Sequence, residues 1–119
     1  MARDDYDVIV FKVLLYLYAV LKRKTLFSAE DFYNKIGYEH INNDYFVDVL
    51  WMMTKDGLIE GLGFIHTWTN ERRLCSELEE VRITSEGIHY LKENNRMNRI
   101  KEVLLNDIDT IAALITRCL

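Results

Sequence analysis

Hydrophobic residues near the start of the chain recur at three- and four-residue steps, which is the period of an amphipathic helix. These positions are Phe11, Leu14, Leu15, Tyr18 and Leu21. Acidic residues precede them and the basic residues 22–24 follow them, as the helix dipole favours, so we predict a helix over about 5–24. Apolar residues also fill most of the opposite side, which predicts that this helix is covered on two sides.

A short β-prone segment and a second helix are predicted next. Residues 25–27 suit a stub of strand that pairs with a hairpin further along the chain. Ser28 then precedes the helical pattern of residues 29–36 and can cap it. Gly37 follows and can adopt the left-handed backbone that ends a helix.

A third helix is bounded by an asparagine and a glycine. Asn42 or Asn43 caps its start, the helix runs to Lys55 or Asp56, and Gly57 ends it. If the protein bound DNA in the usual way, this helix would enter the major groove.

Beyond Gly57 the hydrophobic pattern changes from helical to alternating, which predicts two paired strands. The first covers residues 58–67, the turn lies around 69–71, and the return strand spans about 73–83. Glycines at 61 and 63 predict a bulge or bend in the first strand. The chain therefore doubles back as a β-hairpin.

Two helices are predicted after the hairpin. Thr84 or Ser85 caps a fourth helix that stops at residues 94–95. A final helix over about 97–117 has a row of apolar side chains at alternating three- and four-residue steps. This row consists of Ile100, Leu104, Ile108, Ile111 and Ile115. It can pack onto the first helix of the same chain or form a homodimer through the terminal helices, and the pattern leaves both open.

This order of elements predicts an α+β, predominantly helical fold. The specific prediction is a winged helix-turn-helix domain with a β-hairpin wing and additional N- and C-terminal helices. With 119 residues, 1–119 form a single domain, whose core covers about 5–95 and whose C-terminal helix covers about 97–117.

Composition and charge limit the function classes. The net charge of −4 and the pI near 5.3 have the wrong sign for indiscriminate binding to a phosphate backbone, so any nucleic-acid site must be local. Cys75 and Cys118 have no metal-ligand spacing, and the three histidines lie in three different predicted elements. We therefore predict a binding protein with no catalytic residues, no metal and no cofactor, rather than an enzyme.

The amino terminus and the first apolar run predict a cytoplasmic location. Acidic residues occupy the place where a signal peptide needs a basic region. The apolar run over 8–21 is interrupted by Lys12 and is shorter than the roughly 20 residues that cross a bilayer. We expect no membrane partner.

The predicted hairpin and third helix together favour double-stranded DNA as a partner. Basic and polar side chains at the hairpin tip suit phosphate contacts, and side chains of the third helix would face the groove. The predicted contacts are Tyr45, Lys55, Thr69, Asn70, Arg72 and Arg73. For the two arginines, solvation or pairing with Glu71 and Glu77 is equally open. This interpretation makes the protein a transcriptional regulator, and it narrowly leads.

The acidity of the third helix supports a second interpretation. Asp44, Asp48 and Asp56 lie on its outward side with only Lys55 against them, and carboxylates facing phosphates cost affinity. The alternative is a protein-interaction module with no DNA binding, which uses the acidic helix as a nucleic-acid mimic or binds a host factor. Trp68, beside the hairpin tip, is then the exposed anchor, whereas Trp51 fits the core better.

Three segments carry a family resemblance. Residues 5–18 (DYDVIVFKVLLYLY), 55–61 (KDGLIEG) and 82–91 (RITSEGIHYL) resemble the YjcQ family of small winged-helix proteins, and the likeness extends over nearly the whole chain. The resemblance implies a winged-helix fold and an origin in Firmicutes, their phages or their prophages. No molecular activity comes with the family, so the resemblance leaves the function open.

Overall fold

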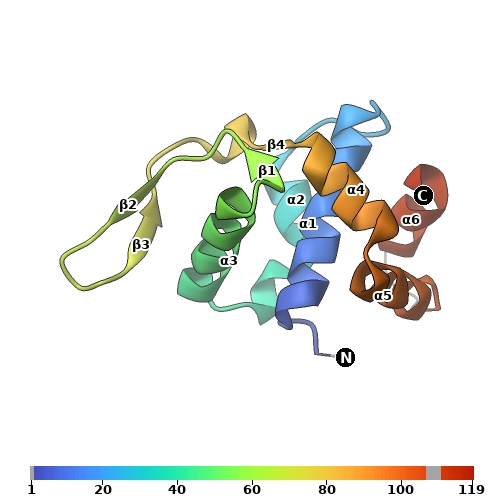
Figure 1. The fold of residues 1–119 in the computed structure, drawn as a ribbon, viewed down its shortest axis with the longest axis horizontal. Helices are drawn as coiled ribbons and strands as arrows, with labels where there is room; N and C mark the ends of the chain where they lie inside the picture. Colours follow the sequence, from blue (N-terminus) through green and yellow to red (C-terminus); the bar gives the residue numbers. More distant parts are fainter. Residues whose placement is uncertain (1, 107–110) are drawn as a thin grey trace.

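The computed structural model describes residues 2–106 and 111–119 of the chain (Figure 1). The helices among these residues are α1 (Tyr6–Leu21), α2 (Ala29–Ile36), α3 (Asn43–Lys55), α4 (Ser85–Glu93), α5 (Asn95–Leu105) and α6 (Ile111–Cys118). The strands are β1 (Ile59–Glu60), β2 (Phe64–His66), β3 (Arg72–Leu74) and β4 (Arg82–Ile83). The predicted α+β, predominantly helical class is confirmed. None of the described helices combines the length and apolarity needed to cross a bilayer.

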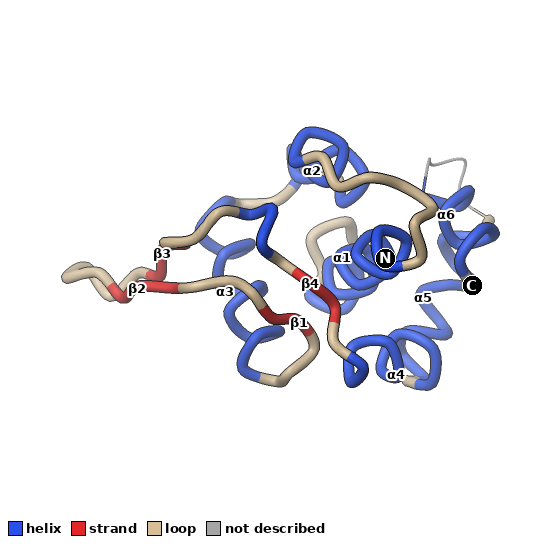
Figure 2. The backbone as a smooth tube through the Cα atoms, turned by 90° about the horizontal axis from the view of Figure 1, so that it is seen from above, coloured by secondary structure: helices blue, strands red, loops and turns tan. Residues whose placement is uncertain are grey.

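Helix α1 forms the centre of the fold. Every residue from Val8 to Leu17 is buried, and all five other helices and β4 pack against α1. Figure 2 shows α1 with the other elements arranged around it. This arrangement confirms that both sides of the helix are covered. The helix ends at Leu21, earlier than predicted, and Arg23 adopts a left-handed φ of 62° just beyond its end.

The next helices begin and end where their local signals predict. Ser28 caps α2, Asn42 caps α3 and Thr84 caps α4, each accepting hydrogen bonds from backbone N–H groups in the first turn. Gly37 and Gly57 follow the ends of α2 and α3 with φ of 71° and 78°. Capping depends on contacts within a few residues, so the sequence alone was enough to locate these helices.

The predicted strand at residues 25–27 is wrong, because this segment forms a loop. The Tyr16 hydroxyl approaches the Leu26 carbonyl oxygen to 3.4 Å and accepts from the Ser28 N–H at 3.3 Å. The Phe27 ring packs edge-on against Tyr16, with the ring centroids 5.8 Å apart. A buried side chain therefore satisfies backbone groups in this segment that a strand partner would otherwise take.

The predicted hairpin is present, but each of its strands is divided. Strand β1 pairs antiparallel with β4, with Ile59 opposite Ile83. Strand β2 pairs antiparallel with β3, with Phe64 opposite Leu74. The continuous strands predicted over 58–67 and 73–83 are therefore wrong, although the doubling back is right.

A close crossing of the two chain segments explains the break between these sheets. Gly61 has φ of 95°, and a Cβ built there would lie 2.0 Å from the Glu80 carbonyl oxygen. The opposite segment forms a 3-10 turn over Leu78–Glu80 instead of continuing the ladder. Beyond this crossing, the β2–β3 hairpin projects away from the helices (Figure 1).

The predicted single helix over 97–117 is wrong, because α5 ends at Leu105 and α6 begins at Ile111. Both helices pack against α1 and against each other. The apolar row of Ile100, Leu104, Ile111 and Ile115 is buried within this one chain. Ile108 lies outside the described residues. The row therefore packs onto the first helix, which is one of the two arrangements the sequence allowed.

Candidate binding surface on α3 and the β2–β3 hairpin

Two arginines of the β2–β3 hairpin contact α3, and Arg72 makes two of these contacts. The guanidinium carbon of Arg72 lies 3.7 Å from the centroid of the Trp51 ring, and its Nη1 donates to Asp48 Oδ1 at 3.3 Å. Asp48 and Trp51 are three residues apart on α3 and so lie on the same side of the helix. Arg72 thus combines a cation–π contact and an ion pair on one side of α3.

The neighbouring arginine is also paired. Arg73 Nη1 donates to Asp44 Oδ1 at 2.7 Å, and its Nη2 donates to Glu71 Oε2 at 2.5 Å. The Asp44 contact ties the hairpin to α3, whereas the Glu71 contact lies within the hairpin. All three side chains are partly exposed to solvent, so neither ion pair is buried.

These contacts decide the charge of the surface. Asp44, Asp48 and Glu71 provide three carboxylates against the two guanidiniums of Arg72 and Arg73, which leaves the cluster one net negative charge. The hairpin tip projects outward, but its two arginines turn back toward α3. A phosphate group would have to compete with carboxylates already in place.

The other predicted DNA contacts are engaged within the chain as well. Tyr45 Oη donates to the Asp4 carbonyl oxygen at 2.8 Å, and Lys55 Nζ lies 5.0 Å from the centroid of the Trp51 ring. In the hairpin turn, Thr69 Oγ1 lies 3.0 Å from Thr67 Oγ1. Asn70 Oδ1 lies 2.8 Å from His66 Nε2. Burial raises the pKa of the Tyr45 hydroxyl, and nearby Asp4 and Asp5 raise it further, so this group stays protonated at neutral pH.

Two apolar side chains of the hairpin face solvent. Trp68 near the tip is fully exposed, at 105% of its reference area, and Ile65 on β2 is 53% exposed. Trp68 is the one member of the predicted partner interface that lies at the surface of the described chain. Large exposed side chains on a projecting element are typical anchors for another macromolecule.

The sequence favours a core position for Trp51, but the structure places it, half-buried, at the base of the hairpin. Its position among apolar residues of α3 gave no sign of the contact with Arg72. That contact depends on where the hairpin lies after folding, and the hairpin is more than 20 residues away in sequence. The one local signal was the spacing of Asp48 and Trp51 on a single helix side.

No cluster of metal-binding side chains is present in the part of the chain that the structure describes. Across residues 2–106 and 111–119, no group of three or more His, Cys, Asp or Glu side chains could hold a metal ion. The two cysteines are free, with Cys75 exposed and Cys118 buried.

The model of the YjcQ protein family matches residues 11–107, which is more than half of the chain. The chain therefore belongs to the YjcQ family, as the three resembling segments predict. Among curated proteins and among solved structures, nothing matches the chain.

Proposed function

We propose that this YjcQ family member is a cytoplasmic winged-helix protein that acts by binding a protein partner, without catalysis and without binding DNA. The order α1, α2, α3 and then a projecting β-hairpin supports the winged-helix assignment. The proposed contact surface is the outer side of the hairpin, with Trp68 as its anchor and the acidic side chains of α3 beside it.

The observation that carries this proposal is the pairing of both hairpin arginines with acids. Arg72 and Arg73 are the hairpin's only basic groups besides His66, and DNA binding would require them to exchange existing ion pairs for phosphate contacts. The released carboxylates of Asp44 and Asp48 would then face the phosphate backbone. Little net attraction to DNA remains.

A protein partner accounts better for the exposed side chains. A buried aromatic side chain removes about 150–250 Å² of surface from water, and tryptophan is among the most frequent hot-spot residues in protein interfaces. The net negative cluster on α3 selects a partner surface that is basic around an apolar pocket. A host or phage protein that itself binds nucleic acid has this chemistry, so α3 would act as a nucleic-acid mimic.

DNA titration tests the first half of the proposal. We expect no saturable binding of a labelled random duplex at low salt and about 100 μM protein, which is the weak end of the usual range of non-specific dissociation constants. Saturable binding that is weakened when Arg72 and Arg73 are replaced with alanine would instead support the DNA-binding regulator.

Partner capture tests the second half. A Firmicutes lysate is passed over the immobilised wild-type protein, the Trp68→Ala variant and the Leu26→Ala variant. Leu26 is a matched control because it is 85% exposed and lies in the loop before α2, not in the hairpin. We expect one protein to bind the wild type and Leu26→Ala and to be lost with Trp68→Ala. Calorimetric titration of that purified protein should show the same order of affinities.

A further inference from the structure

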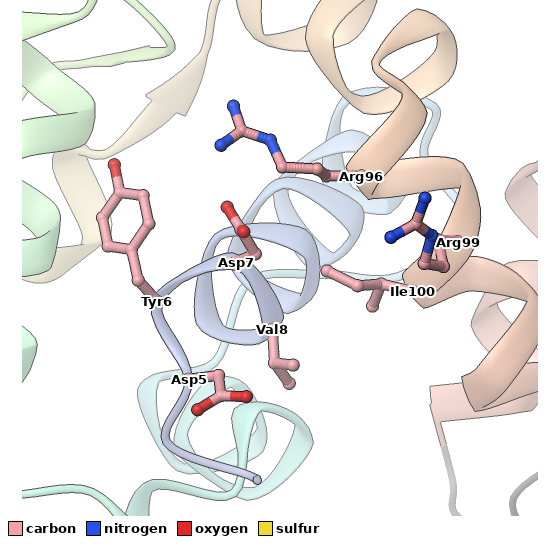
Figure 3. Close-up of a pocket in the computed structure, with 7 residues that line it drawn as sticks. All are labelled: Asp5, Tyr6, Asp7, Val8, Arg96, Arg99 and Ile100. Atoms are coloured by element: carbon pink, nitrogen blue, oxygen red, sulfur yellow. The ribbon is translucent and has the colours of Figure 1, made fainter. Parts of the chain in front are cut away.

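A pocket of about 370 Å³ opens between the first turn of α1 and the start of α5, away from the β2–β3 hairpin. Its polar lining comes from Asp5, Tyr6 and Asp7 on one side and from Arg96 and Arg99 on the other. Figure 3 shows the Arg96 side chain extending from α5 toward α1, with the Asp7 carboxylate pointing to its side, and Arg99 further along α5. The volume lies in the lower part of the range for small-molecule sites.

The positive side of the pocket has no carboxylate partner in the described chain. Arg96 Nη2 donates to the Tyr90 hydroxyl oxygen at 3.3 Å, and Arg99 makes no hydrogen bond or ion pair with a described residue. Both arginines lie in the first half of α5, whose first turn contains no acid, although a helix amino terminus disfavours cations. This contrasts with Arg72 and Arg73, which are both paired with acids.

The negative side has an unsatisfied buried acceptor. Asp7 Oδ1 is shielded from solvent and finds no hydrogen-bond donor among residues 2–106 and 111–119. Its position in the first turn of α1 suits the helix dipole, but the dipole does not supply that oxygen with a donor. Buried polar atoms of folded proteins nearly always have a partner, so an orphaned carboxylate oxygen beside a pocket requires an explanation.

The Tyr6 hydroxyl adds a neutral polar group. Burial raises its pKa, with nearby Asp56, Tyr90 and Asp7 adding to the rise and Arg96 opposing it. At neutral pH the hydroxyl is therefore protonated and can both donate and accept a hydrogen bond. Val8 and Ile100 are both buried and supply apolar lining between the two charged sides.

We propose that this pocket binds a small zwitterion of the amino-acid type. Its carboxylate lies between Arg96 and Arg99, and its methylene groups lie against Val8 and Ile100. Its ammonium group donates to the Asp7 carboxylate after a rotation of that side chain brings the shielded Oδ1 to the pocket surface. A simple anion would meet the carboxylates of Asp5 and Asp7, and a simple cation would meet the two guanidiniums. Only a ligand with both charges provides donors for Asp7 and acceptors for the arginines at once.

A spacing series of probes tests the site. The full chain, labelled with ¹⁵N, is titrated with glycine, β-alanine, 4-aminobutyrate and 6-aminohexanoate, and with acetate and ethylammonium as single-charge controls. We expect one zwitterion to bind at least tenfold more tightly than either control. Its binding should shift the Nε–Hε signals of Arg96 and Arg99 and the backbone signal of Asp7.

Three variants locate the contacts. Arg99→Gln and Asp7→Asn should each weaken the best probe at least tenfold. Lys101→Gln should leave its affinity unchanged, because Lys101 is also on α5 but lines a different pocket, with Lys22 and Lys92. Backbone spectra of each variant verify that it is folded before titration.

Three outcomes would overturn the proposal. The first is that no zwitterion shifts these signals. The second is that acetate binds as tightly as the zwitterions, which makes the pocket a plain anion site. The third is a strong coupling between Asp7→Asn and Arg96→Gln in the absence of any probe. In that case the effect of the double variant on the unfolding equilibrium constant would differ more than tenfold from the product of the two single effects. That coupling would mean that the two side chains pair directly and close the pocket.

Discussion

Arg72 stacks on Trp51, with its guanidinium carbon 3.7 Å from the ring centroid, and so joins the β2–β3 hairpin to α3. The strands of this hairpin have three residues each, and isolated two-stranded hairpins are marginally stable in water. The stack and the ion pairs of Arg72 and Arg73 therefore set the orientation of the hairpin relative to α3.

Replacing Trp51 with alanine should release the hairpin. We expect the free energy of unfolding to fall by about 1–2 kcal/mol, because both the cation–π contact and the packing of the ring are lost. Amide hydrogen exchange of residues 64–74 should accelerate more than that of α1. Trp68→Ala is the matched control and should change stability by less than about 0.5 kcal/mol, since Trp68 is fully exposed. Unchanged exchange of the hairpin in Trp51→Ala would show that the stack does not hold it.

Gly87 should tolerate no side chain. It lies in α4, and a Cβ there would be 2.2 Å from the Leu58 carbonyl oxygen, so Gly87→Ala must displace the backbone. We expect a loss of about 3 kcal/mol or more in urea unfolding, as for severe overpacking. Gly57→Ala is the comparison, because a Cβ there meets nothing within 4 Å and only the left-handed φ of 78° is strained. That strain costs about 1–2 kcal/mol. Equal losses in both variants would contradict the close approach of α4 to Leu58.

Stability should decline above pH 10, partly because of Tyr16. Burial raises the pKa of this hydroxyl above its ordinary value of 10.0, the Ser28 backbone hydrogen bond opposes the rise, and Asp31 adds to it. Below pH 10 both the folded and the unfolded chain keep the proton, so the contribution is complete. Above pH 10 the unfolded chain loses its proton first, and the folded state becomes less stable as pH rises toward the folded pKa.

The Tyr16→Phe variant isolates this contribution. Between about pH 9.5 and 11, its unfolding free energy should fall less steeply with rising pH than that of the wild type, because the variant lacks the tyrosine that titrates late. Deprotonation of lysines affects both proteins equally and cancels in the comparison. In a pH titration followed by absorbance at 295 nm, the wild type should also show one more tyrosine than the variant that ionises at higher pH. Parallel pH dependences of the two proteins would show that Tyr16 keeps an ordinary pKa.

The chain should be monomeric in solution. Ile100, Leu104, Ile111 and Ile115 are already buried against α1 and leave no apolar row for a second copy. A stable dimer interface buries about 800 Å² per partner, and the buried apolar row cannot supply that area. Light scattering at about 100 μM should therefore give the mass of one chain, 14.1 kDa. A dimer that persists on dilution, and that Trp68→Ala does not disrupt, would indicate an interface through the terminal helices.

Local features of the sequence determined much of this fold. The caps at Ser28, Asn42 and Thr84 and the glycines at 37 and 57 locate α2, α3 and α4, because capping involves groups only two to four residues apart. The change from helical to alternating hydrophobicity likewise predicts that the chain doubles back after Gly57. The polar turn between the two strands also lies where the sequence places it, with Asn70 at a left-handed φ of 65°.

The tertiary structure decided what those elements contact. Periodicity showed that residues 100–115 needed apolar cover, but only the packed chain assigned that cover to α1 and divided the segment into α5 and α6. Likewise, the sequence placed Arg72 near a turn, where it suited a phosphate contact, but indicated no partner for it on α3. Folding placed it on Trp51 and Asp48, because a long side chain pairs with whatever the orientation of its strand brings within reach. Local patterns encode helix ends and buried faces, whereas the pairing of charges between distant segments depends on the position of the whole hairpin.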